Sequence, residues 1–502
     1  MGTEIYEYRT AVFKSISNHQ MGRYSLFFEN KIVKNEPIAT TGPYAGYTAL
    51  HIACMDGNIE LVRLLVEDYH ANVNAVAGDG AQPIHLACLF ENSIPRELID
   101  ILLKAGANVD AEIEQQLFEK YIRKKRWLND FGNKMTLLTY SILYGINSTC
   151  LVAFINGNAN LKVKSRNNKT LLMYAIENGH SSLALSLIEA VKDHEWINAR
   201  DSDGYPATHY RLLLDDSRNS RCFNNNDTEF KDDLSSAIVI RELLDAGADV
   251  NATINNDPNS LLINIAALKH FPQTLCELLP YYDNTSKSTA LHYLLRPPKT
   301  PQTESTISTK RACIALILKN IIYRRTFGFF VPEDEKILMD KLIAEDTYYK
   351  KLTHTYKQND VQGELKTKVL KYDDKTITYY DFIMSCFNDK KLRLIVQNKS
   401  LMDAFENTFP NPHSYFIHMS FLNKPDITSY SMECFNDVDY FLIRNQISIR
   451  IKKTSRRLEQ LKALKKIENL YKAIPLPYEL VITIVEYFNY QDFKIFIQAF
   501  YL

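Results

Sequence analysis

A short motif recurs along this chain at a constant interval. The stretches GYTALHIACMDGN and GAQPIHLACLFEN place Thr48 and Gln82 at the same position, 34 residues apart. The stretches TLLTYS and TLLMYA begin at Thr136 and Thr170, which are again 34 residues apart. Weaker copies are GYPATHY from Gly204, LLINIAALK from Leu261 and STALHYLL from Ser288. A fixed interval of this length predicts an array of similar units, each one a small supersecondary structure.

Each copy is followed by a second apolar stretch with helical spacing. These stretches are LVRLLVEDYHANVNA (61–75), LIDILLKAGANVDA (98–111), LVAFINGNANLKV (151–163) and IRELLDAGADVNA (240–252). Their leucines fall on one helix face, which buries against the next unit. Ala53 and Ala87 suit a point where two helices press together, and Gly106 and Gly247 follow a helix end, where a left-handed cap needs no Cβ. No unit hides its apolar face alone, so neighbours stabilise the array.

These residues resemble the ankyrin repeat, which has a period of about 33 residues and the core motif T-P-L-H-x-A. The resemblance covers roughly residues 30 to 320 and implies about seven units, some of them degenerate, with insertions near 112–133 and 215–233. The motif positions are Thr48, Leu50, His51, Ala53, Pro83, His85, Ala87, Gly106, Gly247 and His292. The resemblance implies that the histidines hydrogen-bond within and between repeats, and we favour this role over a metal-binding or catalytic one.

The composition is that of a soluble intracellular protein with no dominant charge. Lys+Arg 59 balances Asp+Glu 59, which gives no general attraction to nucleic acid or to an anionic membrane. The first residues lack the layout of a signal peptide, and no apolar run is long enough to span a bilayer. Eight cysteines are scattered without a C-x-x-C pair, which favours buried free thiols in a reducing compartment. We expect no cofactor, no metal, no nucleic-acid partner and no membrane partner.

The sequence after the repeats has helical patches and no catalytic motif. Residues 323–440 contain no Gly-rich phosphate loop, no G-x-S-x-G elbow and no H-E-x-x-H. His413 and His418 are five residues apart, a spacing that does not suit a metal site on one helix face. We therefore expect no catalytic residues and no enzymatic activity.

A basic helix is predicted from Arg450 to Lys472, in the sequence RIKKTSRRLEQLKALKKIENLYK. Its apolar stripe consists of Leu458, Leu461, Leu464 and Ile467. Basic amphipathic helices of this kind act as nuclear signals, nucleic-acid contacts or membrane-surface elements. A helix that packs through its apolar stripe and keeps a solvated basic face is the alternative that we favour.

The stretch LPYELVITIVEYFNYQDF, residues 476–493, predicts two short helices with more aromatic surface than they can bury between them. Pro477 suits the first turn of a helix, and Glu479 suits the positive end of the helix dipole. Asn489 can cap the second helix. The residues that carry this pattern are Leu476, Pro477, Glu479, Leu480, Ile484, Tyr487, Phe488, Asp492 and Phe493.

This pattern resembles an F-box, the segment that docks on the adaptor subunit of cullin–RING (SCF-type) ubiquitin ligases. A full F-box continues into a further helix, and this sequence stops at Leu502. Ankyrin repeats followed by a truncated F-box resemble the poxvirus ankyrin proteins with a PRANC domain. The alternative is a terminal helical hairpin that only closes the array.

Together these patterns predict an all-α chain: an ankyrin-repeat solenoid, a helical region and a C-terminal F-box-like hairpin. The expected parts are an N-terminal cap at 1–35, ankyrin repeats at 36–322, a helical middle region at 323–445, and the basic helix plus truncated F-box at 446–502. The resemblance implies a non-enzymatic adaptor that captures an unidentified host protein and recruits a host ligase. The alternative is a stoichiometric blocker of host innate signalling, such as NF-kappa-B signalling. We expect the host cytoplasm as its location, and the nucleus is left open.

Overall fold

The computed structural model describes residues 35–37, 41, 45–89, 96–117, 129–144, 148–191, 193–213, 228–281, 290–296, 304–329, 331–358, 361–408 and 433–464. It divides the chain into two compact units, Met1–Lys269 and His270–Leu502. The described chain is mostly helical, as the repeat pattern predicts.

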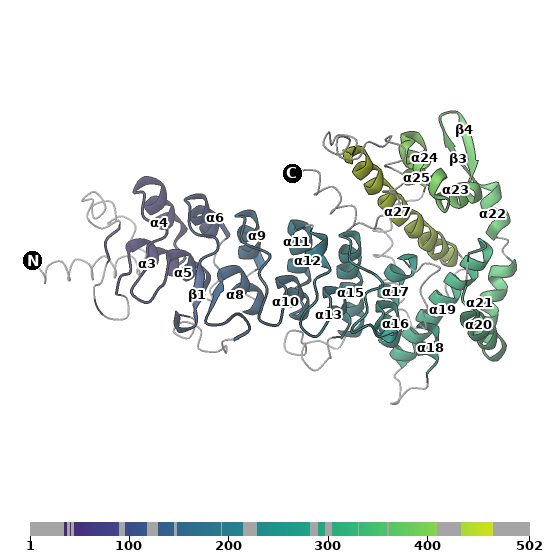
Figure 1. Ribbon diagram of the computed structural model, residues 1–502, viewed down its shortest axis with the longest axis horizontal. Helices are drawn as coiled ribbons and strands as arrows, with labels where there is room; N and C mark the ends of the chain where they lie inside the picture. The colour runs from purple at the N-terminus through teal and green to yellow at the C-terminus, as the bar shows by residue number, and fades with distance from the viewer. Residues whose placement is uncertain are drawn as a thin grey trace, which may run out of the picture. The chain divides into compact units, whose positions relative to one another are not determined.

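The first unit is built from helix pairs, each with a short inner helix and an outer helix (Figure 1). The inner helices are α3 (Ala49–Met55), α5 (Pro83–Leu89), α8 (Leu137–Tyr144), α10 (Leu171–Glu177), α13 (Ala207–Leu213) and α16 (Leu262–Leu268). The outer helices are α4 (Ile59–Arg63) with its π-helical continuation η2 (Leu64–Asp68), α6 (Arg96–Lys104), α9 (Ser148–Asn156), α11 (Ser181–Val191) and α15 (Thr228–Asp245). We number the pairs first to fifth, from α3 and α4 to α13 and α15.

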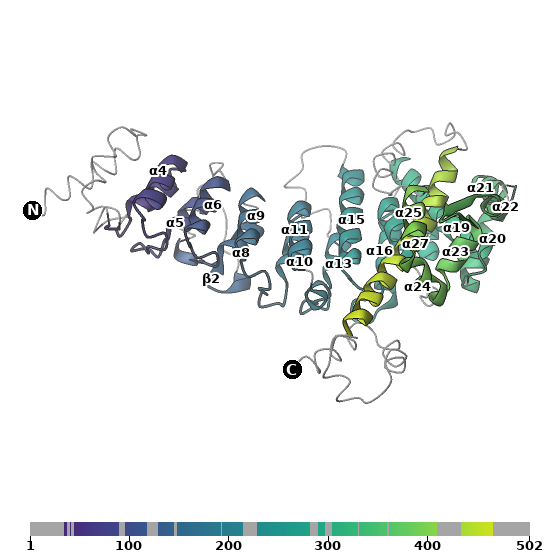
Figure 2. The ribbon, with the colours of Figure 1, turned by 90° about the horizontal axis from the view of Figure 1, so that it is seen from above.

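Successive pairs of the first unit pack side by side (Figure 2). The inner helices in contact are α3 with α5, α8 with α10, α10 with α13, and α13 with α16. The outer helices in contact are α4 with α6, α6 with α9, α9 with α11, and α11 with α15. Each pair therefore buries its apolar face against the next pair, which is what the repeat sequence requires.

The core of the first unit follows the positions that recur in the sequence. Leu50, Ala53 and Ala87 are fully buried. In the fifth pair, Arg211 stands at the position of Ala53 and is also buried. Its Nε donates to the hydroxyl of Ser236 at 3.1 Å. The guanidinium of Arg211 is therefore hydrogen-bonded to α15, the outer helix of the same pair.

The η2 helix accommodates one extra residue at the end of the first outer helix. Ala71 N–H donates to the carbonyl of Leu65, six residues earlier, whereas Ala107 N–H donates to the carbonyl of Leu102, five residues earlier. The left-handed position that Gly106 fills in the second pair is filled here by His70, with φ of 50°. The wider π-turn therefore absorbs the extra residue, and the chain leaves the first outer helix in the same direction as it leaves the second.

The turns that start each pair form short fingers, and some carry β-structure. The strands β1 (Glu112–Glu114) and β2 (Lys134–Thr136) pair antiparallel across the insertion predicted at 112–133. Fingers also bond to one another, since Gly78 N–H donates to the carbonyl of Ala45 at 2.8 Å. A Cβ on Gly46, whose φ is 82°, would lie 2.6 Å from Gly78 N, so this approach needs glycine.

The second unit begins with helices and continues into a mixed helical and hairpin region. Its elements are α17 (Pro272–Leu278), η5 (Leu279–Tyr281), α18 (Ala290–Leu295), α19 (Glu304–Thr326), α20 (Glu333–Glu345), α21 (Thr347–Gln358), α22 (Val361–Thr367), β3 (Val369–Tyr372), β4 (Lys375–Thr378), α23 (Tyr379–Cys386), α24 (Asp389–Gln397), α25 (Lys399–Thr408) and α27 (Glu433–Leu464). An apolar cluster that includes Phe382, Leu392, Phe405 and Ile447 joins α23, α24, α25 and α27.

Two features of the fold differ from the sequence expectations. The chain is not purely α-helical, because β1 pairs with β2 and β3 pairs with β4. In the second hairpin, Asp373 and Asp374 both have positive φ, 44° and 58°, which is the geometry of a two-residue hairpin turn. The insertion expected at 215–233 is also partly helical, since α15 begins at Thr228.

The described part of the predicted basic helix, residues 450–464, lies within α27 and is packed, and residues 465–472 lie outside the described residues. Ile443, Ile447 and Ile451 are spaced four residues apart and are buried against the second unit's core. Leu461 of the predicted stripe is also buried. Arg450 donates from Nε to the carbonyl of Cys386 at 2.9 Å. This part of α27 is therefore a structural helix with an exposed basic side.

Candidate functional site

A threonine and a histidine tie the first inner helix to the next pair. The backbone N–H of Thr48 donates to Nδ1 of His51 at 3.1 Å, and the Thr48 hydroxyl lies 2.8 Å from the same nitrogen. Because Nδ1 accepts, Nε2 carries the proton, and it donates to the carbonyl of Ala81 at 3.1 Å. His51 thus bonds the first pair to the turn that begins the second pair.

The second and fifth pairs keep a histidine at this position. His209 Nε2 donates to the carbonyl of Ser260 at 2.8 Å. His85 Nε2 faces the carbonyl of Ala111 but lies outside hydrogen-bonding geometry. Burial lowers the pKa of His51, and it lowers the pKa of His85 and that of His209 to about 4. All three rings are therefore neutral at pH 7 and serve packing and hydrogen bonding.

The third and fourth pairs carry other residues at the histidine position. Thr139 bonds only to its own cap, since its hydroxyl lies 2.9 Å from that of Thr136. In the fourth pair, Met173 Sδ accepts from Thr170 N–H at 3.4 Å. Among the described residues, neither side chain hydrogen-bonds to the following pair.

His292 departs from the expected role of the motif histidine. Its side chain in α18 is exposed, and its ring lies edge-on to Tyr293 at 6.4 Å between centroids. Leu291, Tyr293 and Leu294 fill the buried face of this helix instead. His292 therefore does not take the buried position that His51 and His85 occupy.

Two asparagines that the sequence analysis did not single out clamp the glycines at the ends of outer helices. Asn74 Nδ2 donates to the carbonyl of Gly106 at 2.8 Å, and Asn74 Oδ1 accepts from Asn108 N–H at 2.8 Å. Asn198 makes the same pair of bonds with the carbonyl of Gly247 and with Asp249 N–H, at 3.0 and 2.7 Å. One amide therefore binds both sides of the next pair's left-handed cap. For Asn74, the Asn-x-Asn spacing of residues 72–74 was the available sequence signal, whereas Asn198 follows Trp196-Ile197 and has no such signal.

The clamp changes at the third pair. Asp110 Oδ1 accepts from Asn160 N–H at 2.8 Å but has no amide N–H to donate. Lys162 follows at the next position, and its Nζ pairs with Asp193 Oδ2 at 2.5 Å. After the third outer helix, an exposed ion pair thus takes the position that the amide clamps of Asn74 and Asn198 have in other pairs.

A network of tyrosines and carboxylates ties together the fingers of the third, fourth and fifth pairs. Tyr174 donates from Oη to Asp130 at 2.6 Å, and Tyr210 donates to Asp201. Lys169 Nζ lies 5.4 and 5.0 Å from the ring centroids of these two tyrosines. Burial and the neighbouring carboxylates raise the pKa of both phenols. This network replaces the histidine bond in the middle of the unit.

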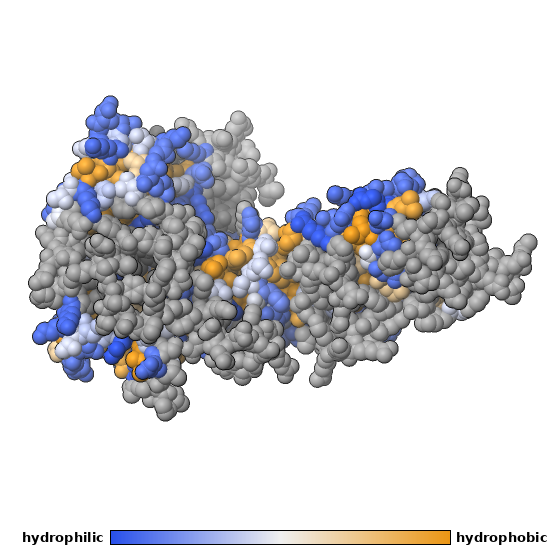
Figure 3. Space-filling view, turned by 180° about the vertical axis from the view of Figure 1, so that it is seen from behind, coloured by the Kyte–Doolittle hydropathy of each residue, from blue (hydrophilic) through white to orange (hydrophobic). Residues whose placement is uncertain are grey.

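The same region carries an exposed face made of finger residues and inner-helix residues. Leu213 and Leu268 are 37% and 56% exposed, and each is the last residue of its inner helix, α13 or α16. Lys164 and Arg166 are exposed in the finger before α10. In Figure 3, which shows the molecule from behind, orange hydrophobic residues lie among blue hydrophilic ones.

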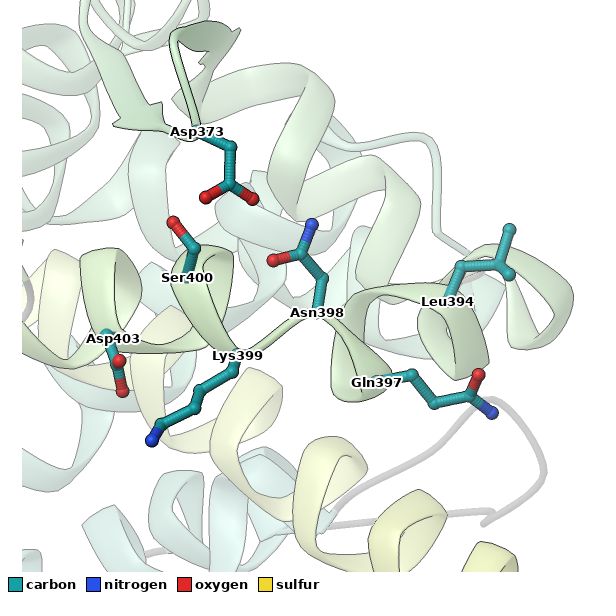
Figure 4. Close-up of a pocket in the computed structure, with 7 residues that line it drawn as sticks. All are labelled: Asp373, Leu394, Gln397, Asn398, Lys399, Ser400 and Asp403. Atoms are coloured by element: carbon teal, nitrogen blue, oxygen red, sulfur yellow. The ribbon is translucent and has the colours of Figure 1, made fainter.

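A pocket of about 780 Å³ lies in the second unit, open to solvent. Asp373, in the turn between β3 and β4, faces Ser400 and Asn398 at the start of α25 (Figure 4). The remaining lining residues are Leu394, Gln397, Lys399 and Asp403. Asn398 Oδ1 already accepts from Leu401 N–H at 2.9 Å, as a helix cap does.

We also searched the residues that the structure describes for metal sites, membrane-spanning helices and cysteine pairs. No group of three or more His, Cys, Asp or Glu side chains there is arranged to hold a metal ion. Within the same residues, none of the helices has both the length and the apolar character needed to cross a membrane. Cys54, Cys88, Cys276, Cys313 and Cys386 are buried free thiols.

The nine F-box-like positions, Leu476, Pro477, Glu479, Leu480, Ile484, Tyr487, Phe488, Asp492 and Phe493, lie outside the described residues. Most of the expected N-terminal cap at 1–35 also lies outside them. Both stay predictions from the sequence.

The comparison with protein families identifies ankyrin repeats. Residues 17–113 match the ankyrin-repeat family in three copies. The crystal structure of an ankyrin repeat domain from Acinetobacter baumannii is similar, with 20% identity and a TM-score of 0.33, over 46% of this chain and 95% of that one. The family match shows ankyrin repeats at residues 17–113, and such repeats suggest a protein-interaction role.

Curated relatives match over short segments. Human BCL-6 corepressor-like protein 1 is 45% identical over 64 residues, 13% of this chain and 3% of its own length. The E3 ubiquitin-protein ligase KEG of Arabidopsis thaliana is 36% identical over 70 residues, 14% of this chain and 4% of the ligase. Ankyrin repeat domain-containing protein 53 of Macaca fascicularis is 33% identical over 70 residues, 14% of each chain. The chain thus spans a small part of the length of each relative.

Proposed function

We propose that this protein is a non-enzymatic adaptor whose ankyrin repeats hold a host protein. The observation that carries the proposal is the set of bonds between helix pairs, since His51, Asn74 and Asn198 each fix one pair to the next. These bonds use side chains on the interior and on the outer loops. They leave exposed positions on the fingers and at the ends of the inner helices, such as Lys164, Arg166 and Leu268, outside these bonds, and a protein-binding scaffold can vary at such positions.

The second half of the proposal is that residues 476–493 recruit a host SCF-type ubiquitin ligase through its adaptor subunit. Its support is the sequence pattern, in which Leu480, Ile484 and Phe488 share one helix face behind Pro477. Such a face would increase the local concentration of the captured protein at the ligase, which carries the chemistry. One relative with similar repeats is itself named as a ubiquitin ligase, although the similar segment is 4% of its length.

The proposed partners are therefore a host target on the repeats and a host ligase adaptor on the C-terminal segment. Nucleic acid and membrane have no part in the proposal. The proposed location is the host cytoplasm, where the ligase would meet a captured target, with the nucleus as a second location.

The direct test is to measure binding of the purified SCF adaptor subunit to the full chain and to its Leu476→Ala, Pro477→Ala double variant. If these residues are interface hot spots, the double variant should lose about 2 kcal/mol or more, roughly thirty-fold in affinity, without a change in melting temperature. Leu394→Ala, a control at a 69% exposed leucine of α24, should leave binding unchanged.

Two results would reject ligase recruitment. One is that the full chain does not bind the adaptor subunit; the other is that the double variant binds it equally well. A host target that still binds the chain after removal of residues 472–502 would then favour the stoichiometric blocker. A lower melting temperature of the double variant would assign Leu476 and Pro477 to a structural hairpin.

A further inference from the structure

The buried histidine of the second pair makes no hydrogen bond to the third pair. In the first and fifth pairs, Nε2 of His51 and Nε2 of His209 each donate to a backbone carbonyl of the unit that follows. His85 Nε2 is buried and has no hydrogen-bond partner. The carbonyl that it faces, that of Ala111, accepts instead from the backbone N–H of Leu137 at 3.2 Å. A buried N–H without an acceptor costs free energy, and water would satisfy it if the joint opened.

The clamp between the outer loops is half complete at the same joint. Asp110 Oδ1 accepts from Asn160 N–H at 2.8 Å, as the side-chain oxygen of Asn74 does one loop earlier. Asn158, with φ of 62°, takes the left-handed position that Gly106 takes in the second pair. Asn74 also donates to the carbonyl at that position, but a carboxylate has no N–H to donate. The second polar contact of this joint is therefore one bond short.

The fingers and inner helices are also joined less closely here. Three other pairs of neighbouring fingers share a backbone hydrogen bond, which joins Gly78 to Ala45, Arg166 to Asp130 and Ser202 to Asn167. Between the described residues of the second finger (76–82) and those of the third (112–117 and 129–136), there is no such bond. The inner helices α5 and α8 pack less closely than other neighbouring inner helices, whereas the outer helices α6 and α9 stay in contact (Figure 2).

We infer that the joint between the second and third pairs is a hinge, at which the first two pairs open from the rest of the first unit on the side of the inner helices. The contact between α6 and α9 holds the outer side together. Opening brings water to His85 Nε2 and leaves the bonded joint between the first and second pairs intact. A hinge of this kind lets the two parts of the array change their angle to fit a partner. The inference does not depend on which partner that is.

The experiment measures how fast diethyl pyrocarbonate modifies each histidine of the full chain at pH 7, from initial rates and mass spectrometry of the digested protein. His51, His85 and His209 are 0%, 2% and 0% exposed, so the closed array shields all three alike. His85 should react at least about tenfold faster than the other two, because two hydrogen bonds are missing at its joint and each changes the opening equilibrium several-fold. His292, which is exposed, gives the rate of an accessible ring.

A repair variant tests whether the joint itself causes the reactivity. Asp110→Asn supplies the N–H that the clamp lacks, so it should slow the modification of His85 about threefold or more and leave His51 unchanged. Asp203→Asn is the matched control, because it removes the same charge from an exposed residue of the fifth finger. This control should leave the rate at His85 as it is in the parent chain.

Three results would overturn the hinge. If His51 reacts as fast as His85 or faster, the opening spreads from the first pair and has no special place at the second joint. If all three buried histidines react at one rate, the array opens only as a whole. If His85 reacts fast but Asp110→Asn leaves its rate unchanged, the motion belongs to the ring within α5 and not to the joint.

Discussion

The first and third helix pairs solve the same packing problem with different chemistry. Between the first and second pairs, a buried neutral histidine, His51, and an amide, Asn74, each bond across the joint. After the third pair, Thr139 does not reach across, and the exposed pair Lys162–Asp193 stands near the outer loops. The hydrogen bond from Tyr174 to Asp130 joins the fourth pair to the finger of the third pair and so partly replaces the missing histidine bond.

The difference shows which side chains are interchangeable in a repeat. Apolar side chains fill most core positions in every pair, because each pair must bury its face, although Arg211 takes one such position in the fifth pair. Polar contacts across a joint are not fixed in the same way, since a histidine, a tyrosine with a carboxylate, or an ion pair can each supply them. The histidine joints are buried and sensitive to protons, whereas the ion pair is exposed and sensitive to salt.

The largest expected effect is a loss of stability in acid at the histidine joints. The pKa of His85 and that of His209 are about 4 in the folded chain, against an ordinary value of 6.5. The unfolded chain binds these protons first, so stability falls as the pH drops from 6.5 and levels off below about 4. Each histidine should contribute about 3 kcal/mol to this loss, measured as the urea dependence of unfolding at several pH values. Replacing both by Gln should flatten the profile, and an unchanged profile would show that other groups control it.

The second prediction compares the histidine position of two pairs directly. His51→Ala removes the acceptor for Thr48 N–H, opens a cavity and leaves the carbonyl of Ala81 with one donor, Ala77 N–H, in place of two. The expected cost is about 3 kcal/mol. Thr139→Ala removes only a local cap bond and should cost about 1 kcal/mol. Similar costs for the two variants, by chemical denaturation, would contradict the idea that His51, unlike Thr139, bonds one pair to the next.

The third prediction concerns the amide clamp. Asn74→Asp keeps the oxygen that accepts from Asn108 N–H but places a second oxygen against the carbonyl of Gly106. This exposed site should lose about 1 kcal/mol. Asn72→Asp is the matched control, because Asn72 Oδ1 only accepts, from Asn74 N–H. If both variants melt at the same temperature, the donor half of the clamp contributes nothing.

The sequence alone predicted the structural features that recur from one helix pair to the next. The 34-residue interval, Thr48 with His51, and the glycines at 106 and 247 led to the inner helices, the caps and the outer helices, and ankyrin repeats are confirmed in three copies at residues 17–113. The replacement of histidine by Thr139 and Met173 was visible in the sequence, but its consequence was not, because contacts made across a joint depend on the neighbouring finger. The role of Asn74 was missed because an Asn-x-Asn spacing also occurs in ordinary turns.

In the second unit, the structure departs from the sequence pattern at two places. The hairpin of β3 and β4 has a sequence signal, Asp373–Asp374 between strands with β-branched residues, yet helical patches on either side favoured helix. His292 matches the motif by sequence and is exposed in the structure, because Tyr293 and Leu294 take the buried face. The F-box-like segment stays a prediction that only adaptor binding can test.

The smallest expected effect is at the ion pair of the third pair. Lys162 is 61% exposed and Asp193 is 22% exposed, so water competes with the bond and salt screens it. Lys162→Ala should therefore cost at most about 0.5 kcal/mol, and the difference from the parent chain should vanish at high salt. Lys164→Ala, which removes an exposed lysine without an ion pair among the described residues, is the control and should have no effect on melting. A loss as large as that of Asn74→Asp, unchanged by salt, would mean that Lys162 acts through the packing of its side chain and that the two kinds of joint are equally strong.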